Sequence, residues 1–453
     1  MSSGVAASLP LISHSAPECI VAWHKGKPIT RQRFLNEVNQ LAEKLLPGRH
    51  LLNVCNNRYH FSVGLAAAIT TGKVSLLPST YSPEIGAQLK AFAPDVFCLT
   101  DDNTCTIEMP LLHYPSLDAN EMPVNVPDID HDQLIAIVFT SGSTGAPVPH
   151  HKTWQSLVNC VKNEAKRVGL ADDAPQTTII GTVPPQHMYG FESTILMPWQ
   201  SGHAFSSGHP FYPADVCQAI ADTPKPRLLI STPIHLRALL DAEIELPDIA
   251  SVVSATAPLS AALATTIEMR CSAPLTEIYG CTETGQIASR NTTHTNLWHL
   301  FDGITLSTSN DHIYASGGHI AQPTMLNDKI EPLNSVQFLL HERLTDIINI
   351  AGKRHSLASL NHLLTNIPGV IDGAFYMPDE SHDTHITRLT AFVVKTPEVH
   401  AKQIVTVLRE HLDPVFLPRP LLFVDKLPRN STGKLPQTAL KNLYLKNNAR
   451  NPS

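Results

Sequence analysis

The sequence predicts an α/β protein with a large N-terminal domain of β-sheets flanked by helices, followed by a small α+β C-terminal domain. Two observations predict this class. Apolar strand patterns alternate with helical patterns over most of the chain, which is typical of sheets with helices on both faces. Toward the C-terminus the texture changes to short strands and turns, and the chain ends in a compact run of helices and strands.

The elements of the large domain follow from the spacing of apolar residues. Over residues 31–47 apolar side chains recur at helical intervals, and Pro47 marks the end of the helix. Further helices are expected at 61–68, 154–168 and 235–240, and strands at 50–54, 73–78, 134–139, 177–183, 227–231 and 249–254.

The remaining elements are shorter, and those beyond residue 346 predict a small second domain. Short strands are expected at 313–316, 336–340 and 347–351, followed by helices at 357–364 and 401–412 and strands at 371–376, 388–394 and 420–424. A boundary near 343–346 divides the chain into domains 1–343 and 344–453. Because the sequence has no low-complexity linker, we expect a short hinge.

The composition favours an ordinary globular enzyme. The 453 residues are 43% hydrophobic and 16% charged, and a net charge of −7 argues against general nucleic-acid binding. No apolar stretch approaches the ~20 residues of a membrane helix, and the N-terminus lacks the pattern of a signal peptide. The eight scattered cysteines indicate reduced thiols. We therefore expect a cytoplasmic protein; the sequence leaves its oligomeric state open.

Hydroxyls and glycines gather directly after the expected strand 134–139, in Thr140-Ser141-Gly142-Ser143-Thr144-Gly145. Glycine lets the backbone approach a phosphate closely, and backbone N–H groups and hydroxyls can donate to phosphate oxygens. The Walker pattern with its lysine is absent. Alone, such a run is more often a surface turn, but its place after a buried strand favours a phosphate site.

Three further segments carry suitable side chains, although each alone is also consistent with a surface loop. Residues 184–191 include His187, whose imidazole can line a pocket. In residues 279–284 the hydroxyl of Thr282 can hold an α-phosphate, and the carboxylate of Glu283 can hold Mg²⁺. Asp328 can accept hydrogen bonds from a ribose, and Arg343 can brace the sugar or a phosphate.

A lysine near the C-terminal end follows a glycine, in Pro428-Arg429-Asn430-Ser431-Thr432-Gly433-Lys434. One interpretation is a mobile tail lysine. The other is a point charge on a mobile loop that neutralises a transferring phosphoryl group.

In this order the segments resemble the adenylate-forming superfamily, which includes acyl- and aryl-CoA synthetases, peptide-synthetase adenylation domains and beetle luciferases. The resemblance covers nearly the whole chain, from residues 53–58 through 254–259 to Lys434. It implies an AMP-forming acid–thiol ligase, a small β-barrel-like part in the large domain, and a mobile C-terminal lid.

The resemblance also implies ligands and a role for each residue. ATP and Mg²⁺ would bind, and CoA or the phosphopantetheine of an acyl carrier protein would accept the acyl group. The implied role of the first segment is to bind the β- and γ-phosphates, through Thr140, Ser141, Gly142, Ser143, Thr144 and Gly145. Adenine would be contacted by Thr256, Ala257, Pro258 and Tyr279, and the ribose would be bound by Asp328 with Arg343 nearby. Thr282 would bind the α-phosphate and Glu283 would bind Mg²⁺, and these two residues would act in catalysis together with His187 and Lys434. Residues 344–346 would form the hinge. Rotation of the C-terminal domain about this hinge would remove Lys434 from the site and bring the loop at Gly352 to face the thiol acceptor.

Three positions depart from the family pattern. The phosphate loop continues Pro147-Val148-Pro149 where the family usually has Pro-Lys-Gly, which leaves open whether Lys152 replaces the missing lysine. Thr345 stands where the hinge usually has Asp or Lys, with Asp346 next. Ala255 and Thr256 stand where glycines are common.

The residue after His187 bears on the choice of acid. Amino-acid-activating relatives usually have an aspartate there, but this chain has Met188. An aryl or fatty acid is therefore favoured over an amino acid. Two alternatives stay open: an amino-acid adenylation enzyme, and a degenerate nucleotide-binding module without catalysis.

Overall fold

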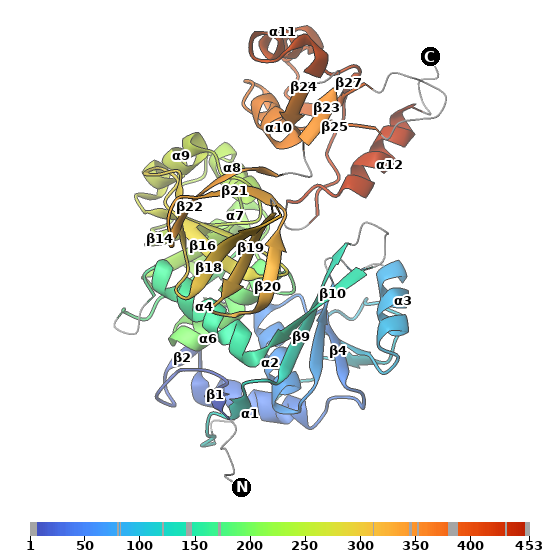
Figure 1. The fold of residues 1–453 in the computed structure, drawn as a ribbon. Coiled ribbons are helices and arrows are strands. Elements are labelled where there is room, and N and C mark those ends of the chain that lie inside the picture. Colours follow the sequence, from blue (N-terminus) through green and yellow to red (C-terminus); the bar gives the residue numbers. More distant parts are fainter. Residues whose placement is uncertain are drawn as a thin grey trace. The chain divides into compact units, whose positions relative to one another are not determined.

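A computed structural model describes residues 7–78, 81, 83–119, 122–141, 147–170, 174–310, 312–343, 347–350, 353–378, 388–430 and 433–448 (Figure 1). The chain folds as two compact units. The first comprises residues 1–307, 314–324 and 333–338, and the second comprises 308–313, 325–332 and 339–453. In the part of the chain described, no helix is long and apolar enough to cross a membrane.

The first unit contains a six-stranded sheet in which a hairpin forms one edge. Its strand order is β10 (Pro147–Thr153), β9 (Leu134–Ser141), β5 (Val74–Leu77), β4 (His50–Asn53), β6 (Phe97–Thr100) and β7 (Leu111–His113). All neighbours are parallel except β10, which returns antiparallel to β9. The helices of this region are α1 (Arg31–Ala42), α2 (Arg58–Thr70) and α3 (Pro83–Phe92).

The second sheet of this unit is largely parallel, as expected from the alternation of strands and helices. Its order includes β17 (Leu297–Leu300), β16 (Gly285–Arg290), β15 (Leu275–Cys281), β14 (Ser251–Ser254), β13 (Arg227–Ser231), β11 (Thr178–Gly181), β12 (Ala204–Ser206), β2 (Ile20–His24) and β3 (Lys27–Thr30). The strands from β15 to β2 are parallel. Parallel strands need crossover connections. The helices in this part of the chain are α4 (Trp154–Arg167), α5 (Met188–Phe191), the π-helix η1 (Glu192–Leu196), α6 (Met197–Ser201), α7 (Pro213–Ala221), α8 (Pro233–Asp241) and α9 (Ala261–Cys271).

Further short strands remain, some of which have residues in both units or in the second unit alone. They are the pair β1 (Ser8–Pro10) and β8 (Asp128–Asp130), the three-stranded sheet of β18 (Ile304–Ser309), β19 (His312–Gly317) and β20 (Ile320–Leu326), and the neighbours β21 (Asp328–Pro332) and β22 (Gln337–Arg343).

The second unit has its own apolar core, which includes Leu360, Leu364, Phe375, Ile404 and Leu408. Its elements are the hairpin β23 (Ile347–Ile350) and β24 (Lys353–Ser356), the sheet β25 (Val370–Tyr376), β26 (Thr390–Lys395) and β27 (Leu421–Phe423), the helices α10 (Leu357–Thr365), α11 (Ala401–His411) and α12 (Gln437–Asn448), and the 3₁₀ turn η3 (Pro414–Phe416).

The predicted fold class is confirmed, whereas several elements end at other residues than expected and some elements were not anticipated. Helix α1 ends at Ala42 rather than near Pro47, because the amides of Glu43 and Lys44 already close the last turn onto Asn39 and Leu41. Helix α12 was not expected from the sequence; its Leu440 and Leu443 join a small core with Tyr376 and Phe392. The domain boundary near 343–346 stays a prediction, since 344–346 lie outside the described residues.

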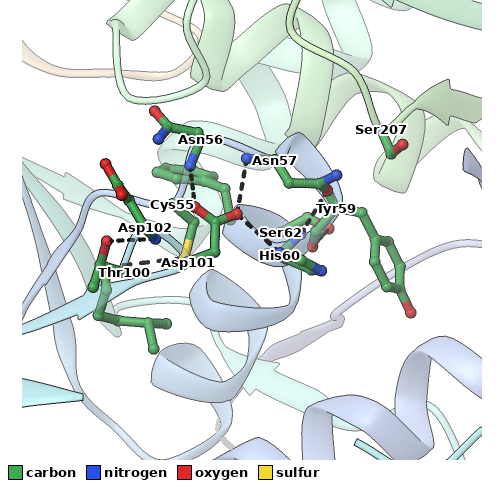
Figure 2. A network of polar contacts seen from close by, with 12 residues as sticks. Cys55, Asn56, Asn57, Tyr59, His60, Ser62, Thr100, Asp101, Asp102 and Ser207 are labelled. Carbon is green, nitrogen blue, oxygen red and sulfur yellow. Dashed lines mark hydrogen bonds and ion pairs between the residues drawn. The ribbon is translucent and has the colours of Figure 1, made fainter. Parts of the chain in front are cut away.

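A polar network fixes the start of α2 (Figure 2). The carboxylate of Asp101 accepts hydrogen bonds from the backbone amides of Asn56 and Asn57, at 2.7 and 3.0 Å, and lies 2.9 Å from Nδ1 of His60. Hydrogen bonds from these amides and from His60 hold the pKa of Asp101 below its usual range, although burial opposes the shift. The network orients the first turn of α2 and the arginine that opens the helix.

Arg58, the first residue of α2, is fully buried and links two parts of the first unit. Its guanidinium donates to the carbonyls of Gly181 and Val183 and to the Thr194 hydroxyl, at 2.7, 3.1 and 2.6 Å. These acceptors lie at the end of β11 and in η1. Arg58 therefore braces the chain on both sides of residues 184–191, which include His187.

Candidate active site

Three of the predicted segments meet at one edge of the large parallel sheet. Residues 184–190 follow β11, residues 255–258 follow β14, and residues 279–283 end β15 and begin the next turn. β11 and β14 both pair in parallel with β13, and β15 pairs in parallel with β14. Ligands of open α/β sheets bind outside the carboxyl ends of the strands. The structure thus brings these segments to the edge where a ligand is expected.

The segment expected to bind phosphate connects β9 to β10. Thr140 and Ser141 end β9, with Ser141 opposite Pro147; residues 142–146, which include Gly142, Ser143, Thr144 and Gly145, lie outside the described residues. The Thr140 hydroxyl lies 2.9 Å from Nε2 of His150 on β10. Val148 lies opposite Thr140, and its side chain is 43% exposed. The position that lacks the family lysine therefore presents an apolar side chain to solvent.

Thr282 and Glu283 stand on a tight turn between β15 and β16. The Glu283 side chain is exposed, and Thr282 is half-buried. Gly280 permits the turn, because a Cβ there would lie 2.2 Å from the Gly285 carbonyl oxygen. Lys152, whose role the sequence left open, is buried, and its ammonium donates to the Glu283 carbonyl at 3.1 Å.

The Glu283 side chain suits a magnesium ion that arrives with the nucleotide. Mg²⁺ typically takes one or two protein carboxylates together with substrate phosphates and water. One exposed carboxylate fits that pattern, and among the described residues no group of three or more His, Cys, Asp or Glu side chains forms a metal cage. When bound, Mg²⁺ would neutralise the charge of the phosphates.

The predicted adenine border combines an unusual backbone with an aromatic cluster. Thr256 has φ +79°, a left-handed conformation that β-branched residues rarely adopt, and Ala257 and Pro258 beside it are exposed. The Tyr279 ring packs on Trp298 and Phe338, with centroids 5.6 and 5.8 Å away. The backbone and the ring at this border are therefore both fixed by the protein.

A buried carboxylate ties the two sides of this border together. Glu277 on β15 accepts from the backbone amide of Leu259, from Arg290 and from Thr292, at 3.1, 2.8 and 2.7 Å. Burial raises the pKa of Glu277, and the nearby Arg290 opposes the rise. Sequence reasoning missed this residue, although a lone acid in an otherwise apolar strand was the available signal.

His187 precedes α5 directly and is partly buried. The next residues, Met188 and Tyr189, are buried, and the Tyr189 hydroxyl donates to the Val253 carbonyl at 3.3 Å. Gly190 is required by the turn, since a Cβ there would lie 2.0 Å from the Pro184 carbonyl oxygen. The segment is thus a rigid apolar corner with one imidazole.

The remaining predicted residues belong to the second unit. Asp328 opens β21 and Arg343 closes β22, and these strands are neighbours joined by residues 333–336. The start of one strand and the end of the next lie at the same end of such a hairpin. The backbones of Asp328 and Arg343 are therefore close, as the proposed ribose role requires.

Lys434 is exposed and follows a tight turn. Its backbone amide donates to the Asn430 side chain at 2.9 Å, and Gly433 has φ +79°. Arg429 braces the turn: it donates twice to the carboxylate of Asp372 on β25, at 2.8 Å each, and once to the Gly433 carbonyl at 2.9 Å. Asp372 was missed because its partner lies 57 residues away in sequence.

Comparison with known proteins decides the family. The model of the AMP-binding enzyme family matches residues 15–314, and the model of the AMP-binding enzyme C-terminal domain matches residues 361–434. The chain belongs to the AMP-binding enzyme family. The second match ends at Lys434, the residue expected to lie on the lid.

The relatives of this AMP-binding enzyme are ligases. It is 31% identical over 266 residues to 4-coumarate–CoA ligase of Rhodobacter capsulatus. This alignment covers 59% of this chain and 65% of the relative. It is 28% identical over 305 residues to 4-coumarate–CoA ligase of Halorhodospira halophila, with 65% and 73% covered. The first alignment thus spans just under two thirds of that relative's length.

Solved structures share the fold. The O-succinylbenzoate–CoA synthetase of Bacillus subtilis in complex with AMP superimposes with a TM-score of 0.78 over 96% of this chain and 98% of that chain, at 16% identity. The likeness extends over both units of the chain and confirms the predicted fold class. The matching family models confirm the predicted adenylate-forming superfamily.

Proposed function

We propose that this chain is an AMP-forming acid–thiol ligase. In the first half-reaction a carboxylate oxygen attacks the α-phosphorus of ATP, which forms an acyl-adenylate and releases pyrophosphate. In the second, a thiol attacks the acyl carbonyl and AMP leaves. The thiol belongs to CoA or to the phosphopantetheine of an acyl carrier protein.

The observation that carries the proposal is the turn of Thr282 and Glu283 at the carboxyl edge of the parallel sheet. Adenylation needs positioned donors and charge neutralisation rather than a covalent enzyme intermediate. Thr282 would contact the α-phosphate and Glu283 would hold Mg²⁺, while Tyr279 and residues 256–258 would border adenine. Lys434 would contact the carboxylate and the α-phosphate. The family membership and the ligase relatives support the same reaction.

We further propose an aryl or fatty acid as substrate. Met188 is 7% exposed and begins α5 directly after His187, and a buried thioether offers an ammonium group no counter-charge. The two relatives named for 4-coumarate, an aromatic acid, support an aryl substrate.

The test is the production of AMP and pyrophosphate from ATP over a panel of aryl, fatty and amino acids, once with CoA and once with holo acyl carrier protein. We expect AMP with aryl or fatty acids and a thioester of matching mass with one acceptor. Turnover with amino acids alone would favour the amino-acid adenylation enzyme. A protein that binds ATP but turns over no acid in the panel would be the non-catalytic module.

A further inference from the structure

The turn that carries Glu283 is held from its buried side by two side chains distant in sequence. Lys152 of β10 donates from Nζ to the Glu283 carbonyl at 3.1 Å, and Nε2 of His319, which directly precedes β20, lies 3.0 Å from the Thr284 carbonyl oxygen. A carbonyl only accepts, so this nitrogen of His319 carries the proton and donates. Both side chains are 7% exposed. Two consecutive carbonyls of the turn are therefore fixed from within.

Two further buried side chains, those of Glu192 and Cys160, close the same side of the turn. Gly285 has φ +73°, and a Cβ there would lie 2.9 Å from Oε1 of Glu192 and 3.2 Å from Sγ of Cys160. Cys160 in turn donates to Glu192 at 3.2 Å. The turn therefore has no room to sink inward, and the outward direction of the Glu283 side chain follows from this packing.

Lys152 is unusual because a lysine side chain is rarely so buried. Burying a charge is costly unless it is paired and hydrogen-bonded. Here the carboxyl of Glu192 is near enough to interact with the charge, and the hydrogen-bond acceptor is the backbone of the residue expected to bind Mg²⁺. Val148, His150 and Lys152 alternate along β10 and share one face of the strand. The strand that follows the phosphate loop thus contributes a lysine to the Glu283 turn.

We propose that Lys152 and His319 are positioning residues that fix the Glu283 carboxylate for Mg²⁺ by holding the Glu283 and Thr284 carbonyls. The inference rests on the proposed function, because it takes the metal role of Glu283 from there. It assigns Lys152 to the metal side of the site and not to direct contact with the phosphates.

The test measures metal binding rather than turnover. Mn²⁺, which is visible by electron paramagnetic resonance, is titrated into the protein saturated with a non-hydrolysable ATP analogue; nucleotide affinity is measured separately in EDTA. We expect Lys152→Met to weaken Mn²⁺ binding about tenfold, the effect of losing one charged hydrogen bond. Nucleotide affinity in EDTA should stay within about twofold of the wild type, since a phosphate contact is not removed.

Matched variants separate positioning from general damage. Lys152→Arg keeps a donor and should restore much of the affinity, and Lys162→Met, on the exposed side of α4, should change nothing. Because Lys152 acts through Glu283, the double variant Lys152→Met/Glu283→Gln should bind Mn²⁺ no more weakly than Glu283→Gln alone.

Two results would overturn the proposal. Equal losses of nucleotide affinity with and without metal would show that Lys152 touches the phosphates, and additive losses in the double variant would show that it acts independently of Glu283. If Lys152→Met does not fold, His319→Leu tests the same turn at the Thr284 carbonyl, with the same expected loss and the same contrary results. Since the readout is binding, a failure to turn over any acid would count against the proposed function alone.

Discussion

At the scale of single residues, the predicted adenine border contains a side chain in a strained backbone. Thr256 has φ +79°, and a non-glycine residue held there costs about 1–3 kcal/mol. The family commonly has glycine at this position, which adopts the conformation freely. The chain therefore keeps a β-branched residue at some cost in stability, at the predicted adenine border.

We predict that Thr256→Gly raises the melting temperature of the unliganded protein by about 1–3 °C, because relief of strain exceeds the added entropy of the unfolded chain. Thr265→Gly is the matched control. Thr265 is an exposed residue inside helix α9, where glycine lowers stability by roughly 1 kcal/mol. Calorimetry of both variants decides the point; a fall in both melting temperatures would mean that Thr256 is not strained.

At the scale of elements, helix α4 and the π-helix η1 bring two acids into the interior. Glu164 and Glu192 are 0% and 2% exposed, and Ser193 of η1 donates to the Glu164 carboxyl. Gln286 of β16 donates to the Ser193 hydroxyl at 3.0 Å, which joins the three elements. Burial raises the pKa of Glu164 to about 8 and that of Glu192 to about 7, with Lys152 opposing the second shift.

These shifts predict that stability falls as pH rises. The ordinary pKa of a glutamate is 4.5, so the native state holds a proton that the unfolded state has lost, from about pH 5 up to about 8 at Glu164 and up to about 7 at Glu192. The unfolding free energy therefore falls across this window, by up to ~1.4 kcal/mol per pH unit for each such group. Glu164→Gln, which resembles the protonated acid, should flatten the profile and be more stable than the wild type at pH 9.

Urea unfolding at pH 5, 7 and 9 measures this effect. The exposed Glu245 supplies the control, because Glu245→Gln should leave the slope of the wild type intact. Parallel profiles for Glu164→Gln and the wild type would show that Glu164 is ionised in the native state and that the pKa shift is absent.

The strands of the two large sheets show what the sequence was able to predict. Apolar strands and the polar segments after them are local patterns, so β9, β13 and β14 and the motifs that follow β11, β14 and β15 were anticipated within a few residues. The residues that hold these motifs in place were not anticipated. Arg58 is hydrogen-bonded to Gly181, Lys152 to Glu283, and Arg429 to Asp372. Each pair is distant in sequence, and a lone charged residue is ordinarily interpreted as part of the surface.

At the scale of the whole molecule, the expected functional residues are divided between two units. Thr282 and Glu283 belong to the first unit, whereas Asp328, Arg343 and Lys434 belong to the second. The superfamily resemblance implies that the lid contributes Lys434 to adenylation and another surface to acyl transfer. The proposed ligase therefore assigns Lys434 to one half-reaction only.

We predict that Lys434→Ala lowers the rate of adenylate formation by about a thousandfold, because one charge near a developing phosphate charge contributes on the order of 4 kcal/mol. ATP binding should be largely unchanged. Transfer to CoA from a chemically synthesised acyl-adenylate should be slowed less than about threefold, because the lysine is not used in that step. Pyrophosphate release and single-turnover thioester formation measure the two steps.

Asp372→Asn provides a graded version of the same test. It weakens the support of Arg429 for the turn before Lys434 while leaving the lysine in place, so adenylation should fall about tenfold with transfer again unaffected. Pyrophosphate release from Lys434→Ala at the wild-type rate would remove Lys434 from the chemistry. If a variant instead slowed adenylation and transfer equally, the turn would be needed for the structure of the second unit as a whole. The two steps would then not depend on different surfaces of the lid.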